Sequence, residues 1–339
     1  MSDAATTNNP PTSNKSGVLL AIVGMAATFA AGWFLSTNNK DVTEQDITRD
    51  PVGISTQLEQ VVAGKRSSFV DTGATDVTLE KIPKKTRVMR LFLESPNITD
   101  AGLKHLETLQ DVQAISLAGT HITDKGLASL AEFSDLIEVN LNRTDIRGSG
   151  LDHLSGAHRL LELRLRETNM TDDESDVLKK FPHLRRLSLH GTRVTDKAMP
   201  AISELTDLEE LRLGKTIVTD EGLKSISSLS KLRRLSLMGT KVTDKGLDHL
   251  KGLTELYEVL LDETAITDAG LKTLEQLPKL QRVSVGGTKV TGSGIESLSA
   301  KESLTAIYVD EDQVNNDLMQ KLQKEHPALH IEVVSATYE

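Results

Sequence analysis

Residues 287–294, GTKVTGSG, are the segment that comes nearest to an enzyme motif. They have the glycine spacing of a phosphate-binding loop, but Ser293 stands where such a loop needs the lysine that contacts the phosphates. The chain contains neither H-E-x-x-H nor G-x-S-x-G, the signatures of zinc proteases and of serine hydrolases. We therefore predict no catalytic residue, no cofactor and no enzymatic activity.

Histidine and aspartate residues recur at fixed positions, as metal ligands sometimes do. His105, His153 and His249 occupy the same position of a predicted helix, but multiples of 24 residues separate them, so they cannot bind one ion. A Thr-Asp pair such as Thr123-Asp124 brings one carboxylate without further ligands beside it, which favours helix capping over calcium binding. The chain has no cysteine and therefore no thiolate ligand or disulfide. We predict no metal site.

These positions recur because the C-terminal three quarters of the chain repeat every 24 residues without a slip. One column of the repeat is apolar throughout: Leu93, Leu117, Leu141, Leu165, Leu189, Leu213, Leu237, Leu261, Val285, Val309 and Val333. The column two residues earlier is apolar as well: Leu91, Ile115, Val139, Leu163, Leu187, Leu211, Leu235, Val259, Val283, Ile307 and Ile331. A period this short predicts a solenoid in which each unit forms a short strand, a tight turn and a helix.

The unit LRRLSLMGTKVTDKGLDHLKGLTE, residues 232–255, resembles leucine-rich repeats, in particular those with a T-D-x-G-L helix start in F-box-associated and bacterial proteins. The resemblance covers about 270 residues. It implies an α/β solenoid, a right-handed β-α superhelix with a parallel sheet on its concave face. One departure is a threonine where the family usually has Asn or Cys: Thr120, Thr144, Thr168, Thr192, Thr216, Thr240, Thr264 and Thr288. We expect the hydroxyl to bond backbone groups of the loop in the same way.

The solenoid is predicted to span residues 87–334, with eleven strands in register. Residues 50–86 should cap its start, through a helix over 50–64 and a degenerate repeat over 69–82. The last strand, 329–334, carries Glu332, a charge that discourages pairing between sheet edges. Residues 335–339 form a short tail.

Two columns of side chains are expected to point outward from the concave sheet. The first alternates in charge: Glu162, Arg186, Glu210, Arg234, Glu258 and Arg282. It is either a ladder of exposed ion pairs or a comb of charges for a partner, and the ladder is the favoured interpretation. The second alternates small and large residues with a period of 48: Ser116, Asn140, Arg164, Ser188, Arg212, Ser236, Leu260, Ser284 and Tyr308. Duplication of repeat pairs explains this alternation as well as a groove for a periodic ligand does.

The densest polar cluster on this face is our candidate for the partner-binding patch. It consists of Asn140, Asn142, Arg143, Arg164, Arg166, His190 and Arg212. Aromatic residues, which often dominate binding energies, are nearly missing there. We call these seven residues the polar patch.

Residues 17–36 are predicted to form a transmembrane anchor, because GVLLAIVGMAATFAAGWFL carries no charge and is long enough to span the hydrocarbon core. A cleaved signal peptide, which would make the protein secreted or periplasmic, and a buried helix are the alternatives. Residues 1–16 form a tail before the anchor and 37–49 a polar linker after it. A short tail before a large domain favours a solenoid on the extracytoplasmic side.

Together these features predict a membrane-tethered binding or scaffold protein that recognises a protein or an extracytoplasmic polymer. A substrate receptor like the F-box leucine-rich-repeat proteins of ubiquitin ligases is the alternative, although no F-box is recognisable. The net charge of -10 argues against nucleic acid as the partner. The solenoid is expected to be monomeric.

Overall fold

The computed structural model describes residues 60–61, 63–64 and 67–334. The chain divides into two units, residues 1–53 and 54–339, and all described residues belong to the second. The predicted anchor over residues 17–36 and its linker lie outside the described residues. Within the described part, no helix is long and apolar enough to cross a membrane.

The described residues form one parallel sheet whose strands follow one another in chain order, each paired with the next. The strands are β1 (Ser68–Val70), β2 (Arg90–Phe92), β3 (Ala114–Ser116), β4 (Glu138–Asn140), β5 (Glu162–Arg164), β6 (Arg186–Ser188), β7 (Glu210–Arg212), β8 (Arg234–Ser236), β9 (Glu258–Leu260), β10 (Arg282–Ser284), β11 (Ala306–Val309) and β12 (His330–Val333). The register between neighbours is 24 residues, as in Leu163↔Leu187, so the columns of the sequence are columns in space.

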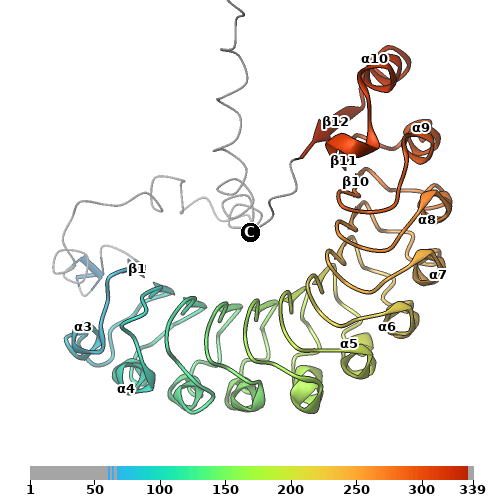
Figure 1. The fold of residues 1–339 in the computed structure, drawn as a ribbon. Helices are drawn as coiled ribbons and strands as arrows, with labels where there is room; N and C mark the ends of the chain where they lie inside the picture. The colour runs from blue at the N-terminus through green and yellow to red at the C-terminus, as the bar shows by residue number, and fades with distance from the viewer. Residues whose placement is uncertain (1–59, 62, 65–66, 335–339) are drawn as a thin grey trace, which may run out of the picture. The chain divides into compact units, whose positions relative to one another are not determined.

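Short helices connect consecutive strands and lie on the outer side of the curved stack, opposite the sheet (Figure 1). They are α3 (Asp76–Glu80), α4 (Asp100–Leu103), η2 (Lys104–Leu106), η3 (Gly126–Leu130), η4 (Ser149–Leu154), η5 (Asp172–Lys180), η6 (Asp196–Ala198), α5 (Met199–Ser203), α6 (Asp220–Ile226), α7 (Asp244–Leu247), η7 (Asp248–Leu250), α8 (Asp268–Leu274), α9 (Gly292–Ser299), η8 (Glu311–Gln313) and α10 (Asn316–Glu325). Those labelled η are 3-10 helices. Every helix between Gly126 and Lys180 is of this kind.

The sheet has one strand more than the eleven predicted, since β1 pairs with β2 through Phe69↔Leu91. Phe69 is buried in the core, so the degenerate first repeat packs like a regular one. Of the predicted cap helix over 50–64, few residues are described. Among these, Val61 is buried in the core and Gly64 has a φ of +68°, which suits a residue that ends a helix.

Each repeat sends its apolar columns into one continuous core between the sheet and the helices. The threonine column at the strand-to-helix turn is buried beside it, and the hydroxyl of Thr120 donates to the carbonyl oxygen of Leu117 at 2.7 Å. Seven further threonines donate in the same way: Thr144, Thr168, Thr192, Thr216, Thr240, Thr264 and Thr288. The predicted role of this column is confirmed. The hydroxyl thus bonds a backbone carbonyl of each turn, in five of them beside the backbone N–H of the same threonine.

Candidate functional site

The alternating charge column on the inner face of the sheet forms ion pairs, as predicted, but its carboxylates are buried rather than exposed. Glu162 is 2% exposed and accepts from Nε of Arg186 at 2.5 Å, and the Arg164 side chain on its own strand pairs with it too. Glu210 is 4% exposed and accepts from Nε of Arg212 at 2.7 Å. Because long arginine side chains from the same and neighbouring strands cover these carboxylates, removing one arginine would leave a buried charge unpaired.

The alternation fails at one end of the column. Glu138 on β4 lies in register with Glu162 on β5, so two carboxylates are neighbours where the pattern calls for an arginine. Burial raises the pKa of Glu138, and the negative charge of Glu162 raises it further. The ladder therefore extends from β5 toward the C-terminus and leaves β4 outside it.

The two asparagines of the polar patch form hydrogen bonds with backbone N–H groups and with a neighbouring strand. Asn140 donates through Nδ2 to the Ser116 hydroxyl at 2.9 Å, and its Oδ1 accepts from the backbone N–H of Asn142 at 3.1 Å. Oδ1 of Asn142 accepts from the backbone N–H of Arg166 in the next repeat at 2.8 Å. These contacts join neighbouring repeats where β4 and β5 end, and Nδ2 of Asn142 stays available for other interactions.

Two arginines of the patch share one carboxylate that the sequence-based prediction missed. Arg143 contacts Glu167 through Nε at 2.8 Å, and Arg166 contacts it through Nη2 at 2.7 Å. Burial acts to raise the pKa of Glu167, but the hydrogen bonds from Arg166 and Arg143 outweigh it and lower the pKa. Two guanidinium groups around one carboxylate leave an excess of positive charge at this point.

His190 and Arg212 complete the patch on the C-terminal side. Burial, followed by the positive charges of Arg166 and Lys215, lowers the pKa of His190 to about 4. The ring is therefore neutral at pH 7 and acts as a hydrogen-bonding group rather than a cation. The structure places the seven residues of the patch on β4 to β7 and the turns after them. Its arginines are already paired with carboxylates, and Arg164 is buried.

In the turn after each strand, one position has a positive φ in every repeat from Gly119 to Gly287. Either a glycine or a long charged residue occupies it. Gly191, Gly239 and Gly287 have φ of +68°, +63° and +67°, and Arg143, Glu167, Lys215 and Glu263 have φ between +55° and +57°. A Cβ at Gly191 would lie 3.0 Å from Cγ of Glu167. Gly191, Gly239 and Gly287 therefore make room for the long side chain of the preceding repeat, which accounts for these glycines without a periodic ligand.

The Thr-Asp pairs lie along the rim where the turns enter the helices. The predicted cap is present: Oγ1 of Thr243 accepts from the N–H of Lys245 at 3.4 Å. The aspartate has a further role, since Asp220 accepts from the N–H and the hydroxyl of Thr243 in the next repeat, both at 2.7 Å. We call this contact between repeats the aspartate–threonine relay. It joins seven pairs: Asp76–Thr99, Asp100–Thr123, Asp172–Thr195, Asp196–Thr219, Asp220–Thr243, Asp244–Thr267 and Asp268–Thr291.

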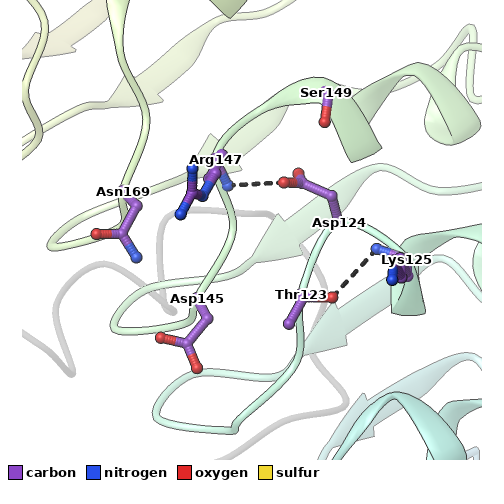
Figure 2. A pocket seen from close by; sticks show the side chains of 7 residues that line it. All are labelled: Thr123, Asp124, Lys125, Asp145, Arg147, Ser149 and Asn169. Atoms are coloured by element: carbon purple, nitrogen blue, oxygen red, sulfur yellow. Dashed lines mark hydrogen bonds between the residues drawn. The ribbon is translucent and has the colours of Figure 1, made fainter.

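The relay is interrupted where Arg147 and Gly148 replace the Thr-Asp pair. A hollow of about 530 Å³ opens beside this point. Its lining comes from three successive repeats, as Figure 2 shows: Thr123, Asp124, Lys125, Asp145, Arg147, Ser149 and Asn169. None of these belongs to the polar patch, and the only signal for them in the sequence was the missing Thr-Asp pair.

Comparisons with known proteins match the repeats. A family model described as "Leucine Rich repeat" matches residues 108–131 and 228–250. An internalin (InlF) from Listeria monocytogenes aligns over 83% of this chain and 77% of its own, at 18% identity and a TM-score of 0.62. Internalin C2 from the same organism aligns over 62% of this chain and 83% of its own, at 22% identity and a TM-score of 0.49. No curated protein matches the sequence. These likenesses concern the fold, and the predicted repeat class is confirmed.

Proposed function

We propose that this chain, a leucine-rich-repeat protein, is a non-enzymatic scaffold that holds a protein partner on the inner face of its sheet. The observation that carries the proposal is the inner face itself, which presents side chains of successive strands in one continuous register. Such a surface offers rigid, evenly spaced contacts, as the concave faces of repeat proteins do.

Within that face, we place the contact at the polar patch. Arg143, which is exposed, and Arg166, which is half-buried, both contact Glu167. Because one carboxylate neutralises only one of the two guanidinium groups, an acidic side chain of the partner fits here. Neutral His190 and Nδ2 of Asn142 lie in the same part of the sheet and supply hydrogen bonds.

A photo-reactive residue at a position beside the patch tests the location of the partner. Ala118, in the turn next to Asn142, is half-buried on the inner side, and Lys224 is exposed on the outer helix α6. The full-length chain with the probe at 118 should crosslink to its partner in cells, and the chain with the probe at 224 should not. Crosslinking from 224 alone would reject the inner face as the binding surface.

Replacement of the two arginines that contact Glu167 tests the patch. The double variant Arg143→Ala/Arg166→Ala should weaken capture of the crosslinked partner about tenfold or more, since it removes two charge-assisted contacts. Arg159→Ala is the matched control, because Arg159 is an exposed arginine with a carboxylate partner, Asp135, outside the patch. Equal loss of capture in the double variant and the control would remove the patch from consideration.

We also propose that residues 17–36 tether the scaffold to a membrane, with the repeats on the extracytoplasmic side. Support comes from the uncharged apolar run and its length. Membrane fractionation with protease protection tests this: the chain should sediment with membranes, and protease added from the extracytoplasmic side should reach the repeats. A chain found wholly in the cytosolic fraction would contradict the tether.

A further inference from the structure

The interruption of the aspartate–threonine relay leaves polar groups without partners at one place on the rim. In a regular repeat the threonine hydroxyl and amide contact the preceding aspartate, as Thr219 does with Asp196 at 2.6 and 2.8 Å. At the interruption Arg147 replaces the threonine, and only its backbone N–H contacts Asp124, at 3.1 Å. The guanidinium group is exposed and forms no ion pair or hydrogen bond with the described residues.

Three more side chains of the hollow share this property. The ammonium group of Lys125, the hydroxyl of Ser149 and the amide of Asn169 line it, and none of them is engaged through its side chain within residues 67–334. Two cations, one hydroxyl and one amide with unused hydrogen-bonding capacity therefore gather around a single hollow. Its volume of about 530 Å³ falls within the range of small-molecule sites, roughly 300–1,000 Å³.

The two carboxylates of the lining differ in what they can offer a ligand. Asp124 accepts from three backbone N–H groups, those of Arg147, Gly148 and Gly150, at 3.1, 3.1 and 2.8 Å. Its charge is therefore held by the chain itself. Asp145 is exposed, its Oδ2 lies 3.7 Å from Nδ1 of His121, and its oxygens can accept from hydroxyl groups.

We propose that this hollow binds an acidic sugar, a saccharide that carries a carboxylate on a hydroxylated ring. Lys125 and Arg147 receive the carboxylate, and Ser149, Asn169 and Asp145 exchange hydrogen bonds with ring hydroxyls. A bare inorganic anion fits less well, because it has no hydroxyl to donate to Asp145. The site lies on the rim, so it is independent of the partner proposed for the inner face.

Calorimetric titration of the full-length chain with a glucuronic acid disaccharide tests the site. We expect saturable binding in the micromolar to millimolar range, and binding at least about tenfold weaker for Arg147→Thr. That variant installs the residue that the regular repeats have, so the fold should tolerate it. Lys125→Ala should weaken binding in the same direction.

Lys245→Ala is the matched control, because Lys245 occupies the position of Lys125 in a repeat with an intact relay. It should bind the disaccharide like the unchanged chain. The proposal is overturned by absence of saturable binding, by equal binding of a neutral glucose disaccharide, or by inorganic sulfate binding as tightly. Equal loss in Lys245→Ala and Arg147→Thr would overturn it too.

Discussion

Two stretches of the same rim use one repeat template in different ways. From Thr195 to Thr291, each aspartate is bound by the threonine of the next repeat, and the stretch is tied together by four successive links. Between Asp124 and Thr171 this link is missing, and a polar hollow lies there instead. In the first stretch a threonine hydroxyl takes part in each link, whereas at the interruption Asp124 is bound only by backbone N–H groups of the next repeat and the Arg147 side chain takes no part.

The interruption also exchanges a large and a small residue that pack against each other across neighbouring repeats. In the regular stretch a Cβ at Gly270 would lie 2.5 Å from Oδ1 of Asp244, so the aspartate and the glycine of T-D-x-G-L fit together across repeats. At the interruption the sizes are exchanged: a Cβ at Gly148 would lie 2.9 Å from Cβ of Glu174. The large residue has moved to the other repeat, and the packing between the repeats is kept.

Truncation of a core leucine should destabilise the two stretches equally. Leu151 follows the interruption and Leu223 lies in the regular stretch, and both are fully buried. Truncation of either to alanine should lower the free energy of unfolding by about 2–5 kcal/mol, since each leaves a cavity of the same kind. Urea unfolding followed by circular dichroism measures both. A difference of more than about 2 kcal/mol between them would show that the interruption also loosens the core.

The next largest loss of stability is expected from removal of one relay aspartate in the regular stretch. Asp220→Ala takes away two hydrogen bonds and leaves the N–H of Thr243 without its acceptor, so we expect a loss of about 1–3 kcal/mol. Asp176→Ala is the control, because the Asp176 side chain is 83% exposed and, among the described residues, pairs with Lys179 alone. That change should cost less than about 0.5 kcal/mol. Equal effects of the two variants would mean that the relay adds no stability.

Repair of the interruption should give the smallest effect, and with the opposite sign. Arg147→Thr, Gly148→Asp and Glu174→Gly together restore the regular pattern and exchange the two sizes back. We expect a gain of about 0.5–1.5 kcal/mol in stability, from the two relay contacts that the change adds, one to Asp124 and one to Thr171. Thermal unfolding followed by circular dichroism measures it. A loss of stability would show that the backbone at Gly148, with φ +122°, cannot adopt the regular turn.

Much of the fold followed from residue types alone. Apolar columns such as the one through Leu163 and Leu187 have one period, and that period determined the strand register. The degenerate repeat over 69–82 was predicted, but its strand, Ser68–Val70, was not counted because the repeat has few consensus residues; pairing with β2 and the burial of Phe69 show its place. Propensity and periodicity are local signals, and a degenerate repeat weakens both.

The candidate sites depended more on the third dimension. The polar patch stays a prediction. The sequence did not indicate that Arg143 and Arg166 pair with Glu167, because distances between side chains depend on rotamers and on the twist of the sheet. Likewise, the alternating charges predicted ion pairs and not their burial. Exposure of Glu162 is decided by neighbouring side chains that fold over it.

The sequence by itself determined the repeat length, the strand positions, the threonine column and the Thr-Asp caps, since each depends on residues within one repeat. Only the tertiary structure decided that Asp220 reaches Thr243 of the next repeat, and that the glycines of T-D-x-G-L leave space for that aspartate. Such contacts form between units distant along the chain. Their geometry is set by how the repeats stack, which no single repeat encodes.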